Sequence, residues 1–274
     1  MHKRIFFGGV HPPTHKSITK DKPIKQASLP KRITLPLYRQ IGKPSKAIVR
    51  PGDYVQVGTK VAQAEGFISS SVHSPVSGKV AGIEPANHPI LGKSVSVIIE
   101  SDGRQEICAG ILQKAPLLDI DSLSPEKIIE AITEAGIVGM GGACFPTHVK
   151  LSPAKGKKID TLIINGAECE PYLTCDHRLM LERPKDILTG VLILCKALRV
   201  KNCIIAIEDN KPDAIEAIRS VILSEAKNLA SDSSGRSFGP QNDMCCVVSL
   251  PTKYPQGGEK QLIKTLLAKE VPSA

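Results

Sequence analysis

The chain has 274 residues, of which 41% are apolar and 23% charged, and its formal net charge is +9. This composition is typical of a soluble protein with room for two domains, and no apolar run is long enough for a transmembrane helix. Tryptophan is absent and aromatic residues make up only 3%. Stacking on single-stranded nucleic acid is therefore disfavoured, and we expect no nucleic-acid partner.

The N-terminal region, residues 1–30, is rich in lysine, proline and glycine and shows no periodicity, which predicts an irregular basic arm. Its apolar part is too short for a signal peptide, so we expect a cytoplasmic location. A simply solvated arm is favoured over one that docks on an acidic partner or an anionic membrane, because no amphipathic pattern accompanies the charges.

Residues 31–102 contain short alternating segments separated by turn residues, which predict a small all-β domain. The pattern P-G-D-x-V-x-x-G begins at Pro51, and S-P-x-S-G-x-V begins at Ser74. Together they resemble the barrel-sandwich fold of biotinyl and lipoyl carrier domains, which expose a modifiable lysine between the two motifs. Residues 64–71 contain no lysine, so we expect this domain to be structural rather than a carrier.

Strand-like and helical segments alternate over residues 116–274. The apolar runs 161–165, 202–207 and 246–250 predict buried strands, with helices between and after them, of which one spans about 213–224. This order predicts a parallel sheet in a Rossmann-like α/β domain. The polar, aperiodic segment 225–243 predicts an inserted, mobile surface loop.

Two segments of this second domain carry groups suited to an anionic ligand. The glycine-rich segment 139–150 ends at Lys150, and its backbone N–H groups could approach an anion closely. Alone it is a weak signal, because its spacing matches neither the Walker nor the Rossmann fingerprint, and a simple tight turn is equally compatible. The run 161–164 opens into Asn165, Glu168 and Glu170 at a strand end, where open α/β sheets bind ligands. Together they indicate a nucleotide or flavin site.

The cysteines form no C-x-x-C pair and no ferredoxin-type run, so we expect neither a zinc nor an iron–sulfur site in this chain. Free thiols are expected in a cytoplasmic protein. Cys195 and Cys203 are expected in the core, whereas three others lie in the candidate site, where a direct redox role is disfavoured. The eight positions are 108, 144, 169, 175, 195, 203, 245 and 246.

Several motifs together resemble one family. FGGVHPP at residues 7–13, the barrel-sandwich patterns, the segments 139–150 and 165–171, and YPQGGEK at residues 254–260 occur in this order. This combination resembles the RnfC subunit of the Rnf ion-translocating electron-transport complex, whose central domain is similar to the flavin subunit of respiratory complex I. Ala167 stands where the complex I pattern has an aspartate.

The resemblance implies a flavin enzyme subunit that binds FMN non-covalently and oxidises NADH as its substrate. Hydride would pass to the flavin without a side-chain acid or base, so no catalytic residue is expected. By motif position, the implied FMN-binding residues are Gly139, Gly141, Gly142, Lys150, Asn165, Glu168, Tyr254, Gly257 and Gly258. The implied NADH-facing residues are Phe145, Glu170 and Glu259.

In the family, electrons continue singly to 4Fe-4S clusters and a ferredoxin-type acceptor, coupled to ion translocation. Those clusters belong to a domain beyond the motif at residues 270–273, so we expect this chain to be truncated and to hold no cluster ligands or other metal. The implied partners are the other subunits of a membrane complex, with the chain peripheral on the cytoplasmic face of the inner membrane. Two alternatives stay open: a non-catalytic truncated scaffold or docking fragment, and a related flavin-dependent cobalamin reductase.

Overall fold

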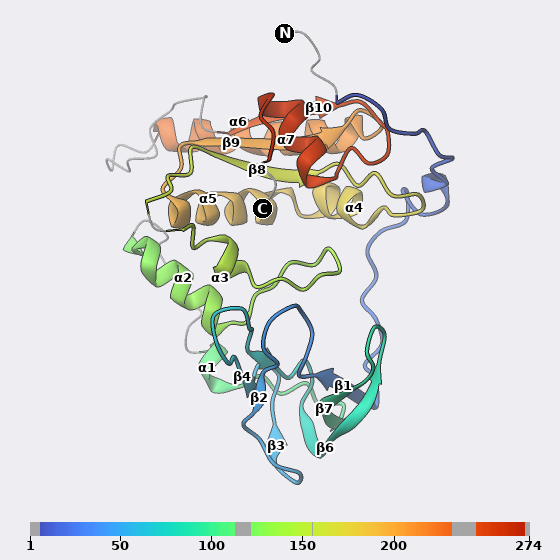
Figure 1. Ribbon diagram of the computed structural model, residues 1–274, viewed down its shortest axis with the longest axis vertical. Coiled ribbons are helices and arrows are strands. Elements are labelled where there is room, and N and C mark those ends of the chain that lie inside the picture. Colours follow the sequence, from blue (N-terminus) through green and yellow to red (C-terminus); the bar gives the residue numbers. More distant parts are fainter. Residues whose placement is uncertain (1–5, 113–121, 155, 232–244, 272–274) are drawn as a thin grey trace. The chain divides into compact units, whose positions relative to one another are not determined.

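The computed structural model describes residues 6–112, 122–154, 156–231 and 245–271 (Figure 1). The chain divides into two compact units. Unit 1 consists of Met1–Gln26 and Ile159–Ala274, and unit 2 consists of Ala27–Lys158. Each unit has a hydrophobic core of its own.

Unit 2 contains two small antiparallel sheets, with strand orders β1-β7-β6-β3 and β2-β4-β5. Alternate side chains of these strands point into one valine-rich core that includes Val61, Val97 and Ile99. The strands are β1 (Arg32–Pro36), β2 (Lys46–Ala47), β3 (Tyr54–Val55), β4 (Lys60–Gln63), β5 (Val72–His73), β6 (Gly78–His88) and β7 (Gly92–Ser101). The expected small all-β module is therefore present.

The segment that would carry the modifiable lysine of a carrier domain, residues 64–71, is exposed at 65–67 and buried at its C-terminal end. Its last residues, Ser69, Ser70 and Ser71, are at most 2% exposed. The Arg39 guanidinium donates hydrogen bonds to the Ser70 hydroxyl at 2.9 Å and to the Ser71 carbonyl at 3.1 Å. Burial lowers the pKa of Arg39. This packing agrees with a structural role for the domain.

The described residues of unit 2 also form three helices, α1 (Ala109–Leu112), α2 (Pro125–Glu134) and α3 (Thr147–Lys150). The expected start of α2 is confirmed, because the Ser124 hydroxyl accepts a hydrogen bond from the Lys127 amide at 3.3 Å. An ion pair between Lys60 and Glu134 joins α2 to β4. The glycine-rich segment 139–150 was expected in the second domain. In the structure its contacts group it with unit 2.

Unit 1 is built on a three-stranded sheet with the order β10-β9-β8, and both of its strand pairs are parallel. The strands are β8 (Thr161–Gly166), β9 (Asn202–Glu208) and β10 (Cys245–Leu250). Helices α4 (Cys175–Glu182), α5 (Pro184–Leu198) and α6 (Pro212–Ser231) connect them, and α7 (Glu259–Leu267) follows β10. The three predicted strands and their parallel arrangement are confirmed.

Both faces of this sheet are covered, as a parallel sheet requires. Ile205 and Ile207 of β9 pack in a cluster with residues of α4, α5 and α6, including Cys195. The intervening Ala206 belongs to another cluster, with Leu262 of α7. Successive side chains of β9 therefore point to opposite faces of the sheet. The polar groups lie at the carboxyl ends of the strands.

The expected loop at 225–243 needs correction. Helix α6 continues to Ser231, so residues 225–231 are helical rather than part of a loop. Alanine, leucine, glutamate and lysine in this stretch favour a helix although its composition is polar. The rest of the predicted insertion, residues 232–243, lies outside the described residues.

The N-terminal arm is not simply solvated. The Val10 and Tyr254 backbones exchange two hydrogen bonds of 2.8 Å, and Lys16, in the short 3-10 helix η1 (Lys16–Ile18), is only 8% exposed. The residues up to Gln26 therefore belong to unit 1. Sequence periodicity could not show this, because the arm is held by contacts with residues far along the chain.

We predict that Gly136→Ala destabilises unit 2 far more than Gly103→Ala. Both glycines have a left-handed backbone, with φ of 64° and 76°, so each alanine costs about 1–2 kcal/mol of strain. A Cβ at Gly136 would also lie 2.2 Å from the Ser71 carbonyl oxygen, whereas one at Gly103 meets nothing within 4 Å. We expect an additional loss of about 1–3 kcal/mol for Gly136→Ala in urea unfolding followed by circular dichroism. Equal losses would contradict the packing of α2 on the buried serine segment.

Candidate functional site

Asn165, at the end of β8, joins two loops of unit 1. Its side-chain amide donates a hydrogen bond to the Gly257 carbonyl at 2.8 Å, and its side-chain oxygen accepts one from the Ala167 amide at 3.2 Å. The Gly257 amide in turn donates to the Cys169 sulfur at 3.3 Å. A Cβ at Gly257 would lie 3.4 Å from both the Ala167 Cβ and the Cys169 sulfur. The loop after β8 and the loop before α7 therefore form one polar surface at the strand ends.

The loop before α7 places the remaining predicted residues of unit 1. Tyr254 is 40% exposed and precedes a cis proline bond. Gly258 is the N-cap residue of α7, and Glu259 is its first residue. The Asn165 side chain is hydrogen-bonded to Gly257, so the loop before α7 contacts the 165–170 loop.

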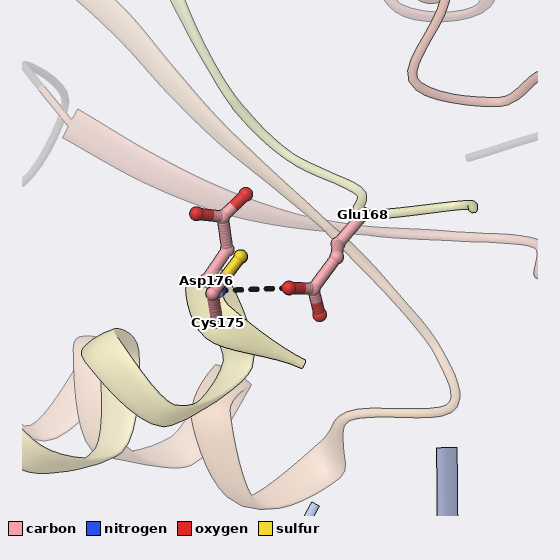
Figure 2. A group of neighbouring side chains, drawn as sticks. All are labelled: Glu168, Cys175 and Asp176. Carbon is pink, nitrogen blue, oxygen red and sulfur yellow. Dashed lines mark hydrogen bonds between the residues drawn. The ribbon is translucent and has the colours of Figure 1, made fainter. Parts of the chain in front are cut away.

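Glu168 has an unusual backbone and a buried side chain. Its φ is 53°, a left-handed conformation that costs about 1–2 kcal/mol for a residue with a Cβ. The side chain accepts a hydrogen bond from the Asp176 amide at 2.7 Å, which Figure 2 shows. Its second oxygen is buried without a hydrogen-bond partner in the described part of the chain. Strain of this kind is typical of functional positions.

Glu168, Cys175 and Asp176 place three potential metal-ligand atoms within 4.8 Å of one another (Figure 2). Burial and the Asp176 charge raise the pKa of the Cys175 thiol, and burial and the Glu168 charge raise the pKa of the Asp176 carboxyl. Metals bind the thiolate rather than the thiol. Cys175 and Asp176 are exposed, and because exposed acidic groups are common without a metal, the proximity of these atoms alone does not establish a metal site.

Two buried lysines donate hydrogen bonds to the loop after β8, and the sequence analysis did not identify either. Lys211 is fully buried after β9, and its ammonium donates to the Ala167 carbonyl at 2.8 Å, to Glu208 at 3.0 Å and to the Asn210 side chain at 2.9 Å. Burial raises the pKa of the Glu208 carboxyl, and the Lys211 charge opposes the rise. The only signal in the sequence is the charged run 208–211, which directly follows an apolar strand at the same edge as Asn165.

Lys16 is the second buried lysine, and it comes from the N-terminal arm. Its ammonium donates hydrogen bonds to the backbone carbonyls of Glu168, Glu170 and Leu173, at 2.9, 3.0 and 2.5 Å. It also lies 3.9 Å from the Glu168 carboxylate. No local pattern distinguishes this lysine from the others of the arm.

The remaining predicted residues lie in unit 2. The Gly139 amide donates to the Phe145 carbonyl at 2.9 Å, which closes the glycine-rich loop at its base. A Cβ added at Gly141 or Gly142 meets nothing within 4 Å, and one at Gly139 would lie 2.8 Å from the Lys150 ammonium. An open glycine backbone beside an ammonium group is chemically suited to a phosphate.

The twelve predicted residues are thus divided between the units. Five lie in unit 2, namely Gly139, Gly141, Gly142, Phe145 and Lys150, and seven lie in unit 1, namely Asn165, Glu168, Glu170, Tyr254, Gly257, Gly258 and Glu259. Their individual roles stay predictions. All eight cysteines are free thiols, and Cys195 and Cys203 lie in the core as expected.

We predict that Lys211→Met destabilises the protein by about 3–5 kcal/mol at neutral pH, because it leaves Glu208 buried and unpaired. Without Lys211, the folded-state pKa of Glu208 should rise further above its unfolded value. The loss should therefore be small below about pH 4–5, where Glu208 is protonated in both states, and grow as the pH rises. Urea unfolding at several pH values measures this, and the double variant Glu208→Leu/Lys211→Met should recover most of the loss. A pH-independent loss would contradict the pairing.

Comparison with known proteins places this geometry in a family. Residues 132–274 match the model of the Nuo51 FMN-binding domain, and residues 4–104 match that of the RnfC barrel sandwich hybrid domain. Both expected domains are thereby supported, while the Rossmann-like detail of the second stays a prediction. A solved NAD+-reducing NiFe-hydrogenase is 21% identical and covers 57% of this chain and 27% of its own, with a TM-score of 0.47.

Curated relatives match along nearly the whole chain. The C subunit of the proton-translocating ferredoxin:NAD(+) oxidoreductase complex of Clostridium ljungdahlii is 43% identical over 98% of this chain and 54% of its own length. The C subunit of the Na(+)-translocating complex of Acetobacterium woodii is 42% identical over 98% of this chain and 56% of its own. The chain thus spans about half the length of these relatives. Within the described residues, no helix has the length and apolar character needed to cross a membrane. The resemblance to the RnfC subunit is confirmed, and the chain belongs to the Nuo51 FMN-binding domain family, with an RnfC barrel-sandwich hybrid domain preceding it.

Proposed function

We propose that this chain is the FMN-binding, NADH-oxidising part of an electron-transport subunit in an ion-translocating membrane complex. One observation carries the proposal: the segment that matches the FMN-binding domain, residues 132–274, contains all twelve residues predicted from the motifs. The open glycine backbone and the strand-end surface supply the donor and acceptor groups that such a cofactor needs.

The residues predicted from the motifs have distinct proposed tasks toward FMN. Gly139, Gly141 and Gly142 allow close approach of the backbone, and Lys150 pairs with the phosphate. Asn165 and Glu168 contact the ring or the ribityl chain, together with the other members of the strand-end surface, namely Tyr254, Gly257 and Gly258. The hydrogen bond from the Asp176 amide fixes the direction of the Glu168 carboxylate before the ligand binds.

NADH is the proposed substrate, and Phe145, Glu170 and Glu259 are the residues proposed to face it. FMN, when bound, accepts a hydride as an electron pair and can return the electrons one at a time. The side chains therefore orient the two ligands and set the local field, and none has to transfer a proton. Glu170 is exposed beside the buried Glu168, which suits contact with a substrate that arrives from solvent.

The onward path of the electrons is proposed from the relatives. They are subunits of ferredoxin:NAD(+) oxidoreductase complexes that translocate protons or sodium ions. We propose the same type of assembly here, with the chain peripheral on the cytoplasmic face of the inner membrane. The 4Fe-4S clusters and the ferredoxin-type acceptor would belong to other parts of that assembly, because the cysteine spacing in this chain provides no cluster motif.

We predict that the purified chain binds FMN saturably and that NADH, added without oxygen, bleaches the bound flavin. Flavin fluorescence during an FMN titration measures binding, and the visible spectrum after NADH addition measures reduction. Free FMN with NADH is the control. A folded chain that binds no FMN would contradict the proposal and favour a scaffold role, whereas binding without reduction would remove NADH as the substrate.

We predict that Lys150→Ala weakens FMN binding by about ten- to hundredfold, because a charge-assisted contact to the phosphate is lost. The same titration with riboflavin, which lacks the phosphate, should give equal affinities for the variant and the parent chain. Lys158→Ala, which changes an exposed lysine of the same unit, is the matched control. An unchanged FMN affinity in Lys150→Ala would remove the phosphate role.

A further inference from the structure

We infer that Lys16 is a positioning residue, which holds the loop 168–173 in its working shape from the N-terminal arm. The inference concerns the backbone geometry of this loop, and it rests on the proposed function only for what the loop binds. The sequence of the arm does not distinguish Lys16 from its other lysines. Among the described lysines of the arm, however, Lys16 alone is buried.

The contacts of Lys16 match the donor geometry of an ammonium group. An ammonium has three N–H donors, and three backbone carbonyls of one short loop, those of Glu168, Glu170 and Leu173, lie 2.5–3.0 Å from the nitrogen. The ammonium therefore acts on this loop as a bound cation would, by drawing its carbonyls to one point. A loop with no regular hydrogen-bond ladder takes a defined shape from such a contact.

The charge balance around Lys16 also favours this role. Burial lowers the pKa of its ammonium, and the Glu168 carboxylate, 3.9 Å away, opposes that shift. The Lys211 ammonium binds the adjacent Ala167 carbonyl. Two buried ammonium groups thus bind carbonyls of the backbone from 167 to 170, and this backbone carries the two glutamates proposed to contact FMN and NADH.

The loop needs an external restraint to keep this conformation. Glu168 and Tyr172 both have left-handed backbones, with φ of 53° and 68°, which residues with a Cβ rarely adopt. Lys16 binds the carbonyl of Glu168 itself and those of Glu170 and Leu173 further along the loop. Removing the ammonium takes this donor away from three carbonyls in the stretch where the backbone is strained, so the loop should relax.

The arm itself is fastened beside the loop, which keeps Lys16 in place. The ring of His15 stacks on that of Tyr172 at 4.8 Å, with an angle of 14° between the planes. Further hydrogen bonds join the arm to the loop and to α4: Tyr172 N to Thr14 O at 2.8 Å, Thr174 to Thr19 side chain at 2.8 Å, Arg178 to Lys20 O at 3.2 Å and Ile24 N to Glu182 at 3.0 Å.

The test compares Lys16→Met with Lys22→Met, which changes an exposed lysine of the same arm. Amide hydrogen exchange of the flavin-free chain is the first measurement. In Lys16→Met we expect the amides of 168–176 to exchange at least about tenfold faster, while those of β9 keep the parent rates. Lys22→Met should match the parent chain throughout. Unchanged exchange in 168–176, or equal acceleration in β9, would overturn the inference.

A second measurement uses the flavin-loaded chain. It is the midpoint potential of bound FMN, which should not change if Lys16 only stabilises the fold. Loss of a buried cation near the strand-end surface should make the midpoint potential of bound FMN more negative in Lys16→Met than in the parent and in Lys22→Met, because reduction adds negative charge. An unchanged potential would overturn the positioning role toward the flavin. If the parent chain binds no FMN, the proposed function fails, and the exchange experiment still decides whether Lys16 shapes the loop.

If Lys16→Met does not fold, the variant Lys16→Arg tests the same inference. Arginine retains the charge, but its planar guanidinium cannot direct three donors at carbonyls that converge on one point. We expect a folded protein with faster exchange in 168–176 than the parent. Parent-like exchange in Lys16→Arg would overturn the claim that the ammonium geometry holds the loop.

Discussion

Two buried ammonium groups determine the geometry on which the candidate site in unit 1 depends. Burying a lysine is unfavourable unless its charge and all its donors are satisfied. Lys16 meets that condition with three backbone carbonyls of the loop after β8, and Lys211 meets it with one carbonyl of that loop and the side chains of Glu208 and Asn210. The same contacts that make burial tolerable also fix the loop. Stability and positioning are therefore inseparable here: the loop gives each cation its acceptors, and the cations give the loop its shape.

The parallel sheet explains why these groups meet. Strands β8 and β9 are adjacent and parallel, so their carboxyl ends lie at one edge, where β8 ends in Asn165 and Gly166 and β9 ends in Glu208. Asn165 then connects this edge to the loop that precedes α7. A small number of side-chain contacts with the backbone thus assembles segments that are far apart in sequence, as the separation of 92 residues between Asn165 and Gly257 shows.

The sequence predicted the features of the fold that depend on neighbouring residues. The β-branched run before Asn165 identified β8, and Ser124 with Pro125 identified the start of α2, because strand periodicity and helix capping are properties of neighbouring residues. Lys16 was missed because its acceptors are 152 to 157 residues away. Residues 225–231 are helical although their polar composition indicates a loop, because their helix propensity is high. The burial of Ser69–Ser71 was likewise invisible, since serine is usually exposed.

The buried serine segment of the barrel-sandwich domain has a consequence for engineering. A carrier domain delivers its prosthetic group on a swinging lysine, which a ligase must first reach and modify. Here that stretch is held by Arg39 and closely approached by Gly136, so a lysine grafted at position 70 would be inaccessible to a ligase and would displace the packing of α2. Restoring biotinylation or lipoylation at this position would require the serine stretch 69–71 to move outward, whereas residues 65–67 of the same segment are exposed.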